Sequence, residues 1–155
     1  MGWVSLSLRK ASLRMGISNL ELRDIQISRT LRQTQRQMHY DQSVIKNNKA
    51  ADLRAIKDVY DAVKQGKPQD MQSQEYSEWY QTYTEAKEEY DYERLQITEM
   101  YDDQLAMLEE EASDKEADLQ QEQTTVETQL EAMRAEFDAV KEQISADIES
   151  STMKL

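Results

Sequence analysis

The sequence predicts an all-α protein built as a long antiparallel two-helix hairpin whose helices pair as a coiled coil. Apolar residues recur at helical spacing in both halves of the chain. Between the halves stands Gly66-Lys67-Pro68, a strong helix-ending signal in a chain with three Gly and one Pro. The halves also differ in charge: residues 1–67 hold 13 Lys/Arg and 6 Asp/Glu, and residues 68–155 hold 6 and 25.

Composition argues against a compact globular domain. Apolar residues make up 38% and charged residues 32%, compared with about 45–50% and about 25% in an ordinary domain. So polar a chain can stay unfolded, but the sustained apolar repeat and the abundance of Gln, Glu, Ala and Leu favour long helices. The absence of cysteine excludes disulfides and thiolate metal sites.

Residues 1–15 are predicted to form an N-terminal arm, either a short extended segment or a separate helix. Val4, Leu6 and Leu8 alternate with serines, as in a strand. Gly16 can break a helix, because Gly costs about 1 kcal/mol relative to Ala in a helix interior.

Residues 16–65 are predicted to form the basic helix. Its seam combines two heptad series, and polar residues interrupt the seam at Lys10, Asp24, Thr34 and Asp41. The members of the two series are Leu6, Leu13, Leu20 and Ile27, and Trp3, Ile17, Leu31, Met38 and Ile45.

Residues 66–72 are predicted to form the turn. Gly66 is expected in the left-handed position that ends many helices. Asp70 or Ser73 is expected to cap the next helix by accepting hydrogen bonds from its free N–H groups.

Residues 73–150 are predicted to form the acidic helix, followed by a tail at 151–155. A turn centred on Gly66–Pro68 places Lys49 near Glu88 and Glu89, and Arg23 near Asp114. The acidic helix then outruns the basic one by about 20 residues, which leaves residues 131–155 without an internal partner.

Three groups of residues are candidates for binding other proteins. Trp and Tyr are enriched in binding hot spots, and the predicted overhang exposes apolar side chains. The candidates are Trp3, Leu6 and Leu8 in the arm; Trp79, Tyr80, Tyr83 and Tyr92 after the turn; and Met133, Phe137, Val140, Ile144 and Ile148 in the overhang.

No catalytic residue, metal site or cofactor is predicted, and we do not expect an enzyme. His39 is the only histidine and is expected on a solvated helix face. The sequence holds no Ser-His-Asp set with support, no P-loop and no Glu-x-x-His pair. The acidic runs 102–103 and 109–111 are expected to be solvated helix faces, since calcium loops need a glycine turn.

The expected partners are other protein subunits, in a homo-oligomer or a hetero-assembly, because a two-helix coil buries little surface. Direct nucleic-acid binding is not expected at a net charge of −12. No transmembrane segment is predicted, and Arg9, Lys10 and Arg14 interrupt any signal peptide. The predicted location is a virion or the bacterial cytoplasm.

In outline the chain resembles the short Gln/Glu-rich coil-containing proteins of tailed-phage virions. It also resembles the small hairpin stalk and adaptor proteins of type III secretion and flagellar export, in size and in the aromatic segment after the turn. The resemblance implies a non-enzymatic coiled-coil subunit of a larger assembly, first of all a phage capsid, portal, neck or tail component. The alternatives are a secretion-system adaptor and an acidic regulatory module that mimics DNA or acts like a chaperone.

Overall fold

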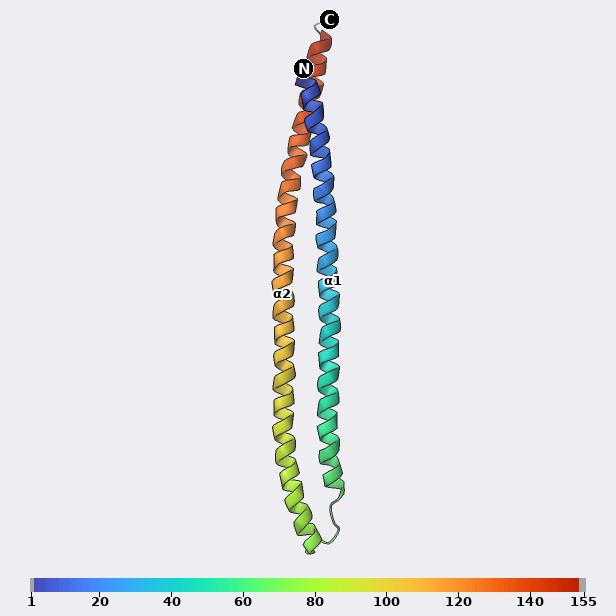
Figure 1. Ribbon diagram of the computed structural model, residues 1–155, viewed down its shortest axis with the longest axis vertical. Coiled ribbons are helices and arrows are strands. Elements are labelled where there is room, and N and C mark those ends of the chain that lie inside the picture. Colours follow the sequence, from blue (N-terminus) through green and yellow to red (C-terminus); the bar gives the residue numbers. More distant parts are fainter. Residues whose placement is uncertain (1, 154–155) are drawn as a thin grey trace. The chain divides into compact units, whose positions relative to one another are not determined.

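The computed structural model describes residues 2–153 and consists of two α-helices, α1 (Gly2–Gln65) and α2 (Gln74–Met153). The helices pack against each other as a hairpin (Figure 1), so the predicted all-α helical hairpin is confirmed. No strand occurs within residues 2–153. Of the predicted tail, residues 151–153 belong to α2, and residues 154–155 lie outside the described part of the chain.

Packing divides the hairpin into two units, each of which holds one stretch of α1 against one stretch of α2. The turn unit comprises residues 36–112. The end unit comprises, among the described residues, 2–35 and 113–153.

The loop between the helices occupies residues 66–73 and is closed by short local hydrogen bonds. The Gly66 N–H donates to the Val63 carbonyl (3.2 Å), so α1 ends in a tightened last turn. Gly66 does not adopt a positive φ, and the expected left-handed position is wrong. Ser73 is the N-cap of α2, because its Oγ accepts a hydrogen bond from the Tyr76 N–H (3.1 Å).

Residues 2–15 form the first turns of α1 rather than an extended or separate arm. The helix continues through Gly16 without a break. A Cβ at Gly16 would lie 3.1 Å from the Met133 Sδ, so the glycine gives the long Met133 side chain room to pack against α1. Close packing at this point accounts for a glycine inside the helix.

The core of the end unit forms around Ile27, which is 1% exposed. Val126 and Leu130 of α2 pack with it. Partly buried apolar residues complete the cluster: Ile17, Leu20, Leu31 and Leu119. The seam predicted from the heptad series therefore lies at the interface between the helices.

Two of the polar residues that interrupt the seam, Thr34 and Asp24, have hydrogen-bond partners. The Thr34 hydroxyl, in a residue 9% exposed, donates to the Thr30 carbonyl (2.8 Å). The Gln123 Nε2 donates to the Asp24 Oδ1 and to the Ser28 Oγ, both at 3.1 Å. These bonds offset the loss of hydration that burial imposes on polar groups.

The register of the two helices differs from the prediction. In the turn unit, Lys49 pairs with Asp102 (3.0 Å) rather than with Glu88 or Glu89. In the end unit, Arg23 pairs with Glu122 rather than with Asp114.

The loop, residues 66–73, is only one residue longer than predicted, so the shift comes from where α2 begins relative to the end of α1. In the turn unit α2 begins beyond the end of α1 (Figure 1). As a result, Trp79 of α2 packs beside Gly66: a Cβ at Gly66 would lie 3.9 Å from the Trp79 Cδ1. The expected pairs are symmetric about Gly66–Pro68 and therefore miss this offset.

Candidate protein-binding surfaces

The aromatic residues after the turn form a stacked cluster within the turn unit. Trp79 and Tyr83 stack with ring centroids 5.1 Å apart, and Tyr60 of α1 stacks on Tyr90 of α2 at 4.8 Å. The indole N–H of Trp79 donates to the Val63 carbonyl (2.7 Å). Trp79 and Tyr83 are half-buried, because much of their side-chain surface packs at the contact between the two helices.

Hydrogen bonding inside the cluster raises the pKa of Tyr60 above the ordinary value of a phenol. Its hydroxyl shares a hydrogen bond with the Tyr83 hydroxyl (3.2 Å). This bond, helped by desolvation, raises the pKa of Tyr60 to about 12. Similarly, the Tyr101 hydroxyl donates to the Asp52 carboxylate, and this bond raises the pKa of Tyr101. Both phenols are neutral at physiological pH and act as packing and hydrogen-bonding groups.

An apolar groove runs beside this cluster and encloses about 290 Å³. Its walls come from both helices: Ala55, Ile56, Val59 and Tyr60 of α1, and Ala86, Glu89, Tyr90 and Glu93 of α2. Val59 is 68% exposed, although it lies beside the stacked Tyr60 and Tyr90 rings. We call this the Val59 groove.

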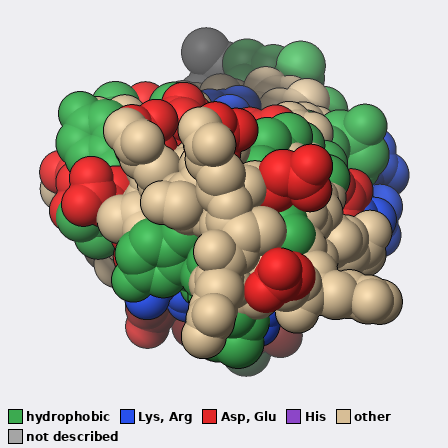
Figure 2. Space-filling model, turned by 90° about the horizontal axis from the view of Figure 1, so that it is seen from below, with side chains coloured by type: hydrophobic (Ala, Val, Ile, Leu, Met, Phe, Trp, Pro, Cys, Tyr) green, Lys and Arg blue, Asp and Glu red, His purple; other side chains and the backbone are tan. Residues whose placement is uncertain are grey.

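Two of the predicted aromatic candidates are open to solvent. Tyr80 is 55% exposed and Tyr92 is 60% exposed. Gln96 Nε2 donates to the Tyr92 hydroxyl (2.6 Å), and Leu95 nearby on α2 is 58% exposed. Figure 2 looks at the turn end of the molecule, where apolar and acidic side chains are interspersed around the backbone.

The N-terminal candidates lie at the start of α1 in the end unit. Trp3 and Leu8 are 49% and 71% exposed, whereas Leu6 is partly buried. Trp3 and Leu6 both belong to the predicted seam, but only Leu6 is partly buried. Trp3 and Leu8 are therefore the members of this group that offer surface to a partner.

The C-terminal candidates mostly pack against α1, and the predicted overhang is wrong. Lys10 Nζ and the Arg14 guanidinium lie over the Phe137 ring, each 5.8 Å from its centroid. Val140 is 8% exposed. The corrected register brings the start of α1 level with this segment: a Cβ at Gly2 would lie 3.2 Å from Asp147 Oδ2.

The remaining C-terminal candidates follow the same pattern. Met133, which packs at Gly16, and Ile144 are partly buried, whereas Ile148 is 49% exposed. Of this group, Ile148 alone offers a large exposed surface. The other residues were expected to be available to another protein because no segment of α1 was expected to pack against them. That reason no longer holds.

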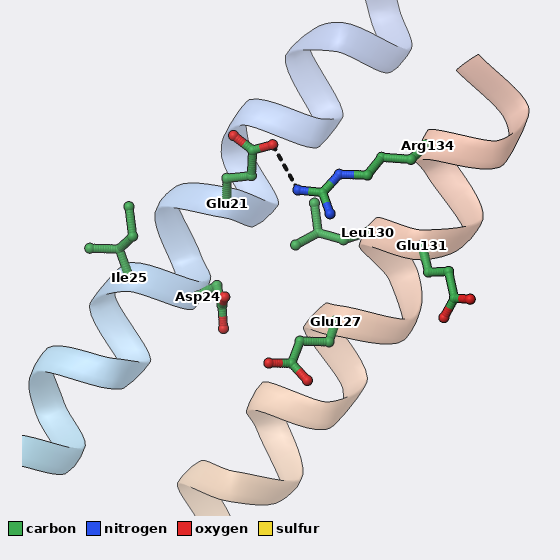
Figure 3. Close-up of a pocket in the computed structure, with 7 residues that line it drawn as sticks. All are labelled: Glu21, Asp24, Ile25, Glu127, Leu130, Glu131 and Arg134. Carbon is green, nitrogen blue, oxygen red and sulfur yellow. Dashed lines mark hydrogen bonds and ion pairs between the residues drawn. The ribbon is translucent and has the colours of Figure 1, made fainter. Parts of the chain in front are cut away.

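The end unit also has an open acidic groove of about 670 Å³ between α1 and α2. Arg134 donates to Glu21 across it (3.0 Å), and Figure 3 shows this bond spanning the two helices. The other lining residues are Asp24, Ile25, Glu127, Leu130 and Glu131. Figure 3 shows Ile25 pointing away from α2.

The sequence candidates omit several exposed apolar residues of α1. Met15, Leu22 and Ile25 are 68%, 55% and 50% exposed. Their signal is present in the sequence, because Leu8, Met15 and Leu22 are spaced by seven residues. It is hidden by the stronger series Leu6, Leu13, Leu20 and Ile27, which lies on another face of the same helix.

Side chains suited to metal binding do not converge in the part of the chain that the structure describes. Within residues 2–153, no group of three or more His, Asp or Glu side chains is arranged to hold a metal ion. His39 is exposed on α1. Neither described helix has a stretch both long and apolar enough to cross a membrane.

Comparison with known proteins adds no relative. No model of a protein family, no curated protein and no solved structure matches the chain.

Proposed function

We propose that the protein is a non-catalytic structural or adaptor subunit that joins other proteins in a larger assembly. The Val59 groove carries this proposal. It keeps a branched apolar side chain 68% exposed next to stacked aromatic rings. Apolar and aromatic side chains of this kind form the cores of protein interfaces, and polar groups form their rims.

The groove suits a protein segment with an apolar side chain and a neighbouring cation. Ala55, Val59 and Ala86 provide a shallow apolar floor, and Glu89 and Glu93 stand beside it. A Lys or Arg of the partner would meet these glutamates while its apolar neighbour covers Val59. Exposed Tyr80 and Tyr92 in the same unit offer further contacts of a type enriched in hot spots.

For the assembly itself, we propose a phage virion, with the chain in the capsid, portal, neck or tail. The support is architectural: a short Gln/Glu-rich chain built as a helical hairpin resembles the coil-containing subunits of tailed phages. A stalk or adaptor of a bacterial secretion system is the alternative within the same functional class.

The test is incorporation of Val59→Arg into purified particles from cells that make the protein. Arg fills the groove and pairs with Glu89 or Glu93, so the fold is preserved while the partner is excluded. The matched control is Val44→Arg, on the same helix and in the same unit but outside the groove. We expect the wild type and Val44→Arg in the particles and Val59→Arg only as free chain. Equal incorporation of the two variants would show that the Val59 groove is not needed for assembly and would contradict the proposal.

A second candidate function is favoured by the acidic groove of Figure 3 and the net charge of −12. In that case the chain is a regulatory module that binds a basic partner. Binding through carboxylates weakens steeply between about 50 and 200 mM salt, whereas docking in the Val59 groove changes little. A salt titration of partner binding distinguishes the two functions.

A further inference from the structure

A second apolar stripe runs along α1 in the end unit and is left uncovered by the hairpin. Its large members are Val4, Leu8, Met15, Leu22 and Ile25, with exposures of 43%, 71%, 68%, 55% and 50%. Ala11 and Ser18, both exposed, complete the row, and we call the seven residues the outer stripe. On the same helix Leu13 and Ile27 are 2% and 1% exposed. The helix therefore has one apolar face turned toward α2 and another turned toward solvent.

The spacing of the outer stripe is that of a coiled-coil seam. Successive members are separated by four, three, four, three, four and three residues. The rows beside it are polar: Ser5, Ser12, Asn19 and Gln26 on one side, and Ser7, Arg14, Glu21 and Ser28 on the other. A stripe this narrow fits another helix, whereas a helix that lies in a membrane surface has a broad apolar face.

We propose that the outer stripe binds the outer stripe of a second copy of this chain, with the two α1 helices antiparallel. In this alignment Leu8 of one copy faces Ile25 of the other, and Met15 faces Ser18. Ala11 likewise faces Leu22 of the second copy. A two-fold axis generates every layer twice, as in an isologous interface. Among the layers that stripe residues alone form, small residues face large ones in two kinds, and two large residues meet in the third.

Charges beside the stripe favour the second copy in this orientation. Arg14 and Glu21 are exposed, lie in the same row and are seven residues apart. Within its own chain Glu21 accepts a hydrogen bond from Arg134 through one carboxylate oxygen, and Arg14 lies over the Phe137 ring, so each would keep its internal contact while it meets the other copy. The antiparallel alignment places Arg14 of each copy beside Glu21 of the other, which gives two complementary pairs.

A parallel alignment of two copies is disfavoured by the same face of α1. After Ile25 the row of the outer stripe continues with Arg29 and Arg32. Parallel helices would set each arginine against its own counterpart, which is repulsive. In the antiparallel alignment Arg29 instead faces Val4 of the other copy. Self-association through the end unit goes beyond the proposed adaptor function, and the Val59 groove takes no part in it.

The first test is the mass of the chain in solution, measured by sedimentation equilibrium. We expect a wild-type dimer and at least about tenfold weaker dimerisation for Leu22→Glu, because the substitution buries an unpaired charge. Met107→Glu is the matched control, since Met107 is 62% exposed on α2 and outside the stripe. Unchanged far-UV circular dichroism checks that both variants are folded. A wild type that stays monomeric at about 100 μM, or Leu22→Glu that dimerises like the wild type, would overturn the proposal.

The second test fixes the orientation, and it is simple because the chain has no cysteine. Leu8→Cys and Ile25→Cys chains are treated with a short thiol cross-linker, separately and mixed. Antiparallel pairing predicts a covalent dimer only in the mixture, because two copies of residue 8 then lie about 25 Å apart. Cross-linking of each variant alone would show parallel pairing and overturn the proposal. So would a monomer that binds lipid vesicles and loses that binding in Leu22→Glu.

Discussion

At the residue scale, Leu22 and Ile27 have opposite surroundings although they lie five positions apart on one helix. Ile27 is 1% exposed in the core of the end unit, and Leu22 is 55% exposed on the outer stripe. We expect Ile27→Ala to lower the free energy of unfolding by about 2–5 kcal/mol, as for other buried aliphatic truncations. Leu22→Ala should change it by less than about 0.5 kcal/mol.

Urea denaturation of both variants checks this, at a protein concentration low enough to keep self-association from contributing. Equal losses of stability would mean that α1 does not present Ile27 and Leu22 to different surroundings.

The pair Tyr60 and Tyr83 predicts a specific dependence on alkaline pH. The hydrogen bond between them raises the pKa of Tyr60 to about 12, above the value near 10 of an unfolded tyrosine. The stabilisation is therefore fully present below pH 10 and is lost as the pH rises toward 12. In an ultraviolet titration, Tyr83→Phe should return one late-titrating phenol toward pH 10. An unchanged titration curve in this variant would contradict the assignment.

Several residue-scale features could be predicted because they depend on local chemistry. Ser73 caps α2 as one of the two expected residues, and the seam positions Leu13 and Ile27 are buried. The conformation of Gly66 could not be predicted in this way. A left-handed residue is one of several helix endings, and here the Gly66 N–H is satisfied by a tightened turn.

At the element scale, the two helices were predictable and their register was not. A heptad seam repeats every seven residues, so a slip by one heptad buries nearly the same apolar surface. The register instead shows in specific partners, such as Gln123 bonded to Asp24 and Ser28. Such partners cannot be identified before it is known how far α2 begins beyond the end of α1. This single uncertainty produced the mistaken overhang, because it displaced Met133 and Phe137 from their sites on α1.

Gly16 tests the packing of α1 against α2. A Cβ there would meet the Met133 Sδ at 3.1 Å, near the end of a flexible side chain that can move by a few tenths of an ångström. We therefore expect Gly16→Ala to stabilise the fold by up to about 1 kcal/mol through helix propensity. Gly16→Ile should destabilise it, because Met133 cannot vacate enough room. Thermal unfolding measures both, and a stabilised Gly16→Ile would contradict the contact with Met133.

At the scale of the whole molecule, the charge difference between the helices is only partly used to pair them. Arg9 pairs with Glu136 and Lys49 with Asp102, as expected for a basic helix beside an acidic one. In the pair of Glu21 and Arg134 the acidic residue is on the basic helix α1 and the basic residue is on the acidic helix α2. Each exposed pair contributes about 0–1 kcal/mol, so apolar packing at the seam stabilises the hairpin and most of the acidic surplus faces solvent.

The proposed protein-binding role of the turn unit can be tested directly by placing a photoreactive amino acid at position 59 in cells that make the protein. Val59 lies in the groove, and the same substitution at Val44 is the control outside it. We predict that light joins the position-59 chain to one structural protein of the assembled particle, and that the position-44 chain gives no such product. Equal products from the two positions, or none from position 59 in a chain that is folded and expressed, would contradict the claim that this hairpin binds its assembly through the Val59 groove.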